Sequence, residues 1–343
     1  MLKSFVRYKF FIFLIISFIV LLYFSPLADG IIMGVVFAYV AKPVRNRLEK
    51  RTGKTASSFI STMLIILPIA FLMFYGVFQG LNQMIYFLTH QKQFEETLVK
   101  VLRNAKVPEK YVDYVVSSIP AVESAFRNAI KVSAVNYTVK AVYFILNFFV
   151  SAVVCFYSLV DGDRFERAAL STVCSLVPEE EKNAVKEMFR AVDETLVSLW
   201  FGNFAFAVLV GIVSIPYFLI FHVPYVPMLS GLMFLAALIP VFAEWMVIVP
   251  VSMYLATVNL TLAIWFFTTG VIFFYILPEL LLRPQFVGYA SRIHPVLLLL
   301  AFIGGAIYGG AFGFFAAPTL VAILSAIHPF LFNQSVGEIK KNR

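Results

Sequence analysis

The sequence has 343 residues and few charged side chains, and this scarcity decides its broad class. Asp, Glu, Lys and Arg make up 13% of it, whereas they make up about a quarter of a soluble domain. Three stretches contain none of these four residue types: 195–243, 245–278 and 293–337. Each is longer than the roughly 20 apolar residues that a helix needs to cross a bilayer. The composition therefore excludes a soluble enzyme and predicts an all-α polytopic membrane protein.

Cysteine, histidine and nucleotide-binding motifs are also scarce. Two cysteines make no disulfide framework, and four scattered histidines without an HExxH pattern predict no metal site. Gly53-Lys54-Thr55 resembles the end of a phosphate-binding loop, but Leu48 stands where that motif requires glycine. We therefore expect no enzyme activity, no cofactor and no ATP hydrolysis. The net charge of +8 predicts no nucleic-acid partner, because Lys and Arg collect in the cytoplasmic loops of membrane proteins.

The basic residues predict how the amino-terminal region, residues 1–54, lies in the membrane. Lys and Arg flank an apolar stretch, 10–41, on both sides, and the only charge within that stretch is Asp29. Because cationic flanks stay in the cytoplasm, both ends of the stretch are expected inside. Two short helices would then form a hairpin with Asp29 at its tip, followed by a basic cytoplasmic loop. The amino terminus is accordingly predicted to be cytoplasmic.

The next region, residues 55–160, is predicted to contain two long spans separated by polar sequence. Within it, residues 92–136 have apolar positions at i, i+3 and i+4 spacing, which is typical of amphipathic helices. We expect them to form a small extracytoplasmic helical cap. The second span ends at Asp161-Gly162, and residues 161–194 are expected to form a cytoplasmic amphipathic helix.

Residues 195–331 contain two segments that are each too long for one straight span and too short for two. Pro227 and Pro250 are 23 positions apart, as are Pro295 and Pro318, so the two segments can be overlaid. Each segment contains helix-breaking residues near its middle. The breaks are expected at Pro240 and Ala243 in the first segment, and at Gly309, Gly310 and Gly313 in the second.

These features predict an inverted repeat as the transport core. Residues 195–257 and 261–331 would each contain a span followed by a re-entrant helical hairpin, with the two copies in opposite orientation. The whole chain would have about eight membrane segments and a basic cytoplasmic tail, 332–343. Inverted repeats with broken helices are a recurring plan of secondary transporters. Two kinked single spans fit the charges at the segment ends equally well, and this alternative stays open.

The few ionisable residues at membrane depth are candidates for substrate or ion coupling, because each is costly there by roughly 3 kcal/mol or more. Glu244 lies at the tip of the first broken segment, has no basic neighbour in sequence and could carry a proton. Glu279 and Arg283 lie four residues apart on one helical face, as a structural pair or as part of a coupling site. His294 either titrates near neutral pH or caps the helix that follows it.

Several motifs lie at the ends of these segments. Asp161-Gly162 closes a span, Arg283-Pro284-Gln285-Phe286-Val287-Gly288 follows another, and Ile293-His294-Pro295 begins a glycine-rich segment that ends at Ala317-Pro318. In these motifs, and over nearly its whole length, the chain resembles the autoinducer-2 exporter (AI-2E) family of prokaryotic permeases. Family members often have glycine and proline where this chain has Ala243 and Glu244, which bears on the substrate. The family positions present here are Asp161, Gly162, Pro284, Gly288, Pro295 and Pro318.

The resemblance implies a set of properties that no residue pattern establishes. It implies export of small molecules, autoinducer-2 in quorum sensing among them, without nucleotide hydrolysis. Some members of the family are described as sodium/proton antiporters. The resemblance also implies a homo-oligomer, a pentamer, with elevator-like motion in the plasma (inner) membrane of a prokaryote, surrounded by membrane lipids. Both termini are expected in the cytoplasm from the positions of the basic residues, Lys340, Lys341 and Arg343 in the tail among them.

Three functions follow as hypotheses. The first is a secondary transporter that exports a small polar organic solute, such as a signalling molecule, with Glu244 coupling a proton. The second is a sodium/proton antiporter using Glu244, Glu279 and Arg283. The third is a non-transporting scaffold or sensor built around 92–136 and 161–194. A cavity that reaches both breaks would favour a transporter, whereas a tightly packed repeat interface would favour a scaffold.

Overall fold

The structure is a computed structural model that describes residues 22–89, 96, 99, 103, 108–239, 244–278, 281 and 293–331. Within these residues the chain forms helices and no strand, so the fold is all-α, as the composition predicts. Among the described residues, five helical segments are long and apolar enough to cross a membrane. They are Leu22–Thr52, Lys54–Phe71, Val139–Leu176, Glu179–Ile220 and Val296–Leu331.

The first half of the chain consists mainly of three long helices. They are α2 (Ala28–Thr52), preceded by the short η1 (Ser25–Leu27), α3 (Lys54–Thr89) and α5 (Glu109–Leu176). α2 and α5 run in the same direction, because Gly30 lies against Val150 and Gly34 lies against Val154. A Cβ atom at Gly34 would be 2.6 Å from the Cβ of Val154. Small residues permit this close approach of helices in membrane proteins.

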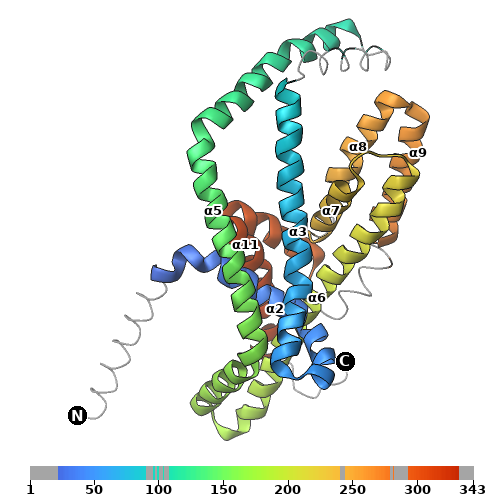
Figure 1. Cartoon of the computed structure of the whole chain (residues 1–343). Helices are drawn as coiled ribbons and strands as arrows, with labels where there is room; N and C mark the ends of the chain where they lie inside the picture. The colour runs from blue at the N-terminus through green and yellow to red at the C-terminus, as the bar shows by residue number, and fades with distance from the viewer. Residues whose placement is uncertain are drawn as a thin grey trace.

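α5 is one helix of 68 residues, and its length differs from the predicted division of this region. Residues 109–136 form the first part of α5, which bends away from the rest of the helix (Figure 1), rather than a helix of their own. The polar segment 161–194 is the end of α5, then η2 (Glu179–Glu181), then the start of α6 (Lys182–Ile220), instead of one amphipathic helix. No glycine or proline occurs between Asp163 and Val177, so α5 continues until Pro178 ends it.

The chain after α6 is divided into short helices. They are α7 (Val226–Ala237), α8 (Trp245–Val258), α9 (Leu260–Val271) and the π-helix η3 (Ile272–Ile276). Figure 1 shows them as a lobe beside the upper part of α6. α7 and α8 are each too short to cross a bilayer, and they flank the predicted first break. The predicted break residues Pro240 and Ala243 lie outside the residues that the structure describes.

Aromatic side chains hold this lobe against α6. The ring of Tyr217 in α6 lies 5.1 Å from that of Phe266 in α9 and 5.0 Å from that of Phe274 in η3. The Tyr217 hydroxyl donates to the backbone carbonyl of Phe266 and lies 3.1 Å from Oγ1 of Thr269. A tyrosine buried with its hydroxyl satisfied in this way fixes the position of α9 relative to α6.

The last helix, α11 (Pro295–Leu331), folds back on itself at Gly309 and Gly310. Gly310 has φ 56° and ψ −134°, a conformation that glycine adopts more readily than any other residue. A Cβ atom at Gly305 would lie 2.2 Å from the carbonyl oxygen of Gly313, whereas residues eight apart in a straight helix are about 12 Å apart. α11 is therefore a helical hairpin, with its break at two of the predicted positions and Gly313 in the contact between its halves.

Candidate functional site

Three pockets lie along α2, between it and neighbouring helices. The first, near the start of α2, contains Asp29, and we call it the Asp29 pocket. The second lies along the middle of α2, and we call it the apolar cavity. The third lies toward the end of α2, and we call it the charged pocket. Residues of α5 and α11 also line each of the three pockets, so α2, α5 and α11 are common to all of them.

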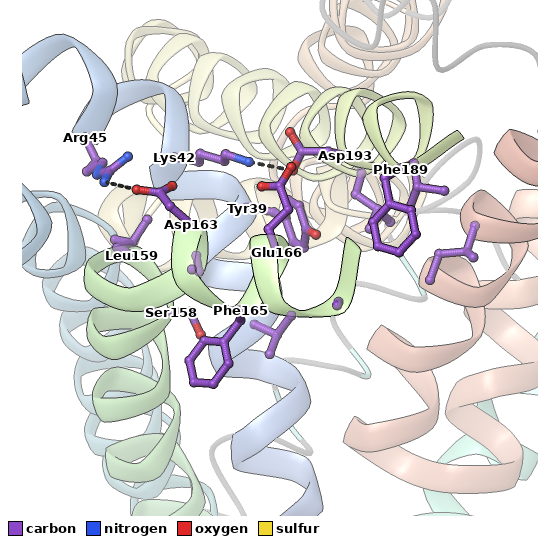
Figure 2. Close-up of a pocket in the computed structure, with 17 residues that line it drawn as sticks. Tyr39, Lys42, Arg45, Ser158, Leu159, Asp163, Phe165, Glu166, Phe189 and Asp193 are labelled. Carbon is purple, nitrogen blue, oxygen red and sulfur yellow. Dashed lines mark hydrogen bonds and ion pairs between the residues drawn. The ribbon is translucent and has the colours of Figure 1, made fainter. Parts of the chain in front are cut away.

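The charged pocket has a volume of about 450 Å³ and is shown in Figure 2. Lys42 Nζ of α2 lies 2.5 Å from Asp193 Oδ1 of α6, and this ion pair joins the two helices. Arg45 is only 6% exposed, and its NH2 nitrogen lies 3.4 Å from Asp163 Oδ2 of α5. Lys54 Nζ, at the start of α3, lies 2.7 Å from the same oxygen. These ion pairs tie α2, α3, α5 and α6 together at one end of the bundle.

The charged pocket carries one more acidic than basic side chain. Its basic lining residues are Lys42 and Arg45, and its acidic ones are Asp163, Glu166 and Asp193. Figure 2 shows the Glu166 carboxylate pointing toward the ion pair between Lys42 and Asp193. A solute or ion that enters this pocket would meet charged groups of both signs.

The apolar cavity has a volume of about 190 Å³ and is lined mainly by aromatic and aliphatic side chains. Asn203 of α6, which is 2% exposed, is also among the lining residues, but the surface that opens onto the cavity is apolar. Leu238, directly after α7, borders it on one side, and Ala311, directly after the break in α11, borders it on another. The cavity thus reaches the flanks of both predicted breaks.

Trp200 of α6 connects the wall of this cavity to both halves of α11. Its ring lies 5.9 Å from that of Phe302, before the break, and 5.7 Å from that of Phe315, after the break. Its Nε1–H donates to Thr319 Oγ1 over 3.2 Å. Because Trp200 contacts both halves, a change in the α11 hairpin would be transmitted directly to the cavity wall.

The Asp29 pocket has a volume of about 160 Å³ and shares Met33, Phe144, Phe148 and Ala311 with the apolar cavity. Asp29 Oδ1 accepts a hydrogen bond from the backbone N–H of Phe312 at 2.9 Å. The Asp29 carboxylate therefore lies at the amino-terminal end of the second half of α11, where a negative charge is favoured. The two pockets share a wall at the tip of the hairpin.

Asn147 of α5 holds the start of α2 in this position. Its Oδ1 accepts from the N–H of Gly30 at 2.8 Å, and its Nδ2 donates to the carbonyl of Pro26 at 3.2 Å. The Tyr143 hydroxyl donates to the same Pro26 carbonyl. These bonds satisfy backbone groups around the first turn of α2, which would otherwise lack partners.

The candidates predicted from the sequence are placed as follows. Glu244 is the residue before α8 and is 2% exposed, and it is not among the described residues that line the three pockets. His294 precedes α11, and its Nδ1 accepts from the N–H of Val296 at 3.3 Å, which is the capping role. Asp161 accepts from Arg164 at 3.1 Å.

The remaining residues predicted from the sequence fall into two groups, those that the structure describes and those that lie outside the described residues. Gly162 lines the charged pocket, Pro295 is the first residue of α11, and Pro318 lies in its second half. Those outside the described residues are Glu279, Arg283, Pro284 and Gly288.

Sequence reasoning did not identify several polar side chains that line the pockets. Asn147 and Asn203 are buried amides inside apolar helices, and a count of charged residues does not register them. An amide within an uncharged stretch is the signal that would have found both. Lys42 and Arg45 are spaced i, i+3 on α2, but their partners come from α5 and α6, so spacing alone does not reveal the pocket.

Comparison with known proteins identifies the family of the chain. Residues 11–332 match the family described as "AI-2E family transporter". A protein of Archaeoglobus fulgidus is 50% identical over 92% of this chain and 91% of its own length, and one of Methanocaldococcus jannaschii is 28% identical over 90% and 92%. A Bacillus subtilis protein is 24% identical over 91% of this chain and 84% of its own length. All three are named "Putative transport protein", two with a further identifier. No solved structure matches the chain with significance. The chain therefore belongs to the AI-2E family of transporters.

Proposed function

We propose that this transporter is a secondary exporter of a small organic solute that carries a polar group, working in the plasma membrane of a prokaryotic cell. The apolar cavity, bordered by Leu238 and Ala311, is the observation that carries the proposal. A tightly packed interface between the two broken segments would have favoured a scaffold instead. The export direction comes from the resemblance to the family.

The broken helices support this proposal on physical grounds. Backbone breaks at membrane depth are tolerated only where surrounding protein or a water-filled cavity satisfies the exposed polar groups. In α11 the side chain of Asp29 satisfies one such group, the N–H of Phe312. We propose that the α11 hairpin is re-entrant from the cytoplasmic side, and that α7 and α8 form the opposite hairpin, with both termini in the cytoplasm.

The three pockets provide a proposed route for the solute. It would enter through the charged pocket at the cytoplasmic end, occupy the apolar cavity between the two hairpins, and leave through the Asp29 pocket. The charged pocket and the apolar cavity are both lined by α2, α5, α6 and α11, so movement of α11 would change both.

We propose Glu244 as the proton-coupling residue. It lies next to the first break, and its side chain is buried in an apolar part of the chain. An ionisable residue inside a membrane protein is costly to bury and is therefore a candidate for ion coupling. Moving one charge across the membrane is worth about 2.3 kcal/mol per 100 mV, enough to drive accumulation.

Efflux from proteoliposomes tests the proposed function without assuming a substrate. The purified protein is reconstituted into liposomes loaded with a ¹³C-labelled extract of small cytoplasmic molecules, and mass spectrometry follows what appears outside. We expect at least one labelled solute to leave faster than from protein-free liposomes. Sodium-driven proton movement with no organic efflux would instead identify an antiporter. If the protein shows neither organic efflux nor sodium-driven proton movement, the proposal is overturned in favour of a scaffold.

A further inference from the structure

We infer that the solute is amphipathic, with an apolar body about the size of one aromatic ring in the apolar cavity and a small polar head in the Asp29 pocket. This inference rests on the proposed function and names the class of its substrate. It narrows the polar solute expected from the sequence to one in which only the head is polar.

The lining of the apolar cavity excludes a solute that is polar all round. Its walls include the side chains of Met33, Phe37, Phe148, Phe234 and Phe315, and the surface that they present to the cavity is apolar. The Trp200 N–H faces Thr319, to which it donates a hydrogen bond. A sugar or polyol in this cavity would lose its hydration at several hydroxyl groups and find few partners, which is unfavourable. An apolar body loses no such hydration, and it makes van der Waals contacts with the cavity walls that are missing when the cavity is empty.

The cavity volume sets the size of the apolar body. A cavity of about 150 Å³ with apolar walls binds benzene. The apolar cavity here measures about 190 Å³, so it accommodates one aromatic ring with a short substituent. The several aromatic rings in the wall favour edge-to-face contacts with such a ring.

The Asp29 pocket supplies the partners for the head. It adjoins the apolar cavity through four shared lining residues, so one molecule can extend from one pocket into the other. Asp29 and Lys140 place one acidic and one basic side chain in its lining, beside the Tyr143 hydroxyl. A head that carries both an ammonium and a carboxylate group, as an amino acid does, matches this pair of charges.

Tryptophan fluorescence provides a direct test, because Trp200 lines the cavity and the chain has only three tryptophans. Trp245→Phe together with Trp265→Phe leaves Trp200, which is 5% exposed, as the sole emitter. The matched control, Trp200→Phe together with Trp245→Phe, leaves Trp265, which is 63% exposed on the outside of the lobe. The probe is 4-bromophenylalanine, whose bromine quenches a tryptophan that it touches.

We expect 4-bromophenylalanine to quench Trp200 saturably and Trp265 weakly and without saturation. Phenylalanine should restore Trp200 emission by competition, whereas glutamine, which has the same head and a polar body, should not do so at about tenfold higher concentration. Val36→Phe places a ring in the cavity and should weaken probe binding about tenfold or more, whereas Val36→Ile, which adds one methylene group, should weaken it less. Size-exclusion chromatography and Trp200 emission without probe confirm that each variant is folded.

Three results would overturn the inference: no quenching of Trp200, equal quenching of Trp200 and Trp265, or equal competition by glutamine. Phospholipids with brominated acyl chains distinguish a lipid occupant, because quenching of Trp200 as strong as that of Trp265 would show a lipid chain in the cavity. The binding experiment and the efflux experiment can give opposite results, and each result bears on a different claim. Efflux of labelled solutes without quenching of Trp200 would leave the proposed function in place and remove only this inference, whereas saturable quenching without efflux would remove the transport function and retain the ligand class.

Discussion

The carboxylate of Asp29 accepts a hydrogen bond from the backbone N–H of Phe312 at 2.9 Å, although 283 residues separate them. The bond joins the start of α2 to the first turn after the break in α11. Asp29 therefore acts as a helix cap supplied by another helix. The tip of the α11 hairpin is held to the bundle by this contact, next to the wall between the Asp29 pocket and the apolar cavity.

Loss of this cap should loosen the hairpin tip. Asp29→Ala removes the acceptor and is expected to destabilise the second half of α11 by ~1 kcal/mol, as other lost caps do. Hydrogen exchange of residues 311–315 in detergent measures it, because faster exchange of these amides reports opening of the first turn. Asp29→Asn keeps an acceptor oxygen and should exchange nearly as the parent does. Equal exchange in all three proteins would contradict the capping role.

Two adjacent glycines in α11 should respond oppositely to the same substitution. Gly305→Ala places a Cβ atom 2.2 Å from the Gly313 carbonyl oxygen, so the two halves must separate, and we expect a loss of ~1–3 kcal/mol. Gly304→Ala meets no atom within 4 Å and removes a flexible residue from a helix, so it should be neutral or stabilise by ~0.5–1 kcal/mol. Thermal unfolding in detergent compares them. The same melting temperature for both variants would count against the folded-back hairpin.

The ion pairs of the charged pocket should differ in their contribution to stability. Lys42 and Asp193 are each partly exposed, so removing either is expected to cost ~1 kcal/mol or less, with a coupling energy of the same order in a double-mutant cycle. Arg45 is buried and pairs with both Glu49 and Asp163, so Arg45→Met should cost more than Lys42→Met. Chemical unfolding measures both. A larger effect of Lys42→Met would contradict the assignment of Arg45 as the buried connection.

Glu244→Gln should separate proton coupling from solute movement. Glutamine has nearly the same shape but takes up no proton in this pH range, so efflux driven by a pH gradient should be lost. Downhill efflux at equal pH should remain. Glu180→Gln, at an exposed position in η2, is the control and should keep both activities. Unchanged gradient-driven efflux in Glu244→Gln would show that this residue does not couple protons.

The sequence was sufficient for features that depend on local composition. The long uncharged stretches predicted an all-α membrane protein, and the glycine pair at 309–310 marked the place where α11 folds back. Residues 161–194 were predicted as one segment from their polar composition, whereas in the structure they divide at Pro178 between the end of α5 and the start of α6. The backbone there has no residue that ends a helix before Pro178, so α5 simply extends beyond the apolar stretch.

The pockets depend on contacts that no local pattern contains. Lys42 meets Asp193 across 151 residues, and Asp29 meets Phe312 across 283. The apolar cavity is formed by side chains that each resemble ordinary core residues, and only their arrangement in space leaves it open. The search of the sequence for charged residues at membrane depth selected Glu244. The polar residues that line the pockets come from different helices, and their spacing in the sequence does not show that they lie together.

The most direct test of the account compares efflux in Val36→Phe and Val36→Ile, because Val36 is buried and lines the apolar cavity. Both variants and the parent protein are reconstituted at equal density, and the rate of the labelled solute identified for the parent is measured. If solute passes through this cavity, Val36→Phe will lower the rate to that of protein-free liposomes, and Val36→Ile will retain most of it. Parent-like efflux from a folded Val36→Phe protein would show that the solute takes another path.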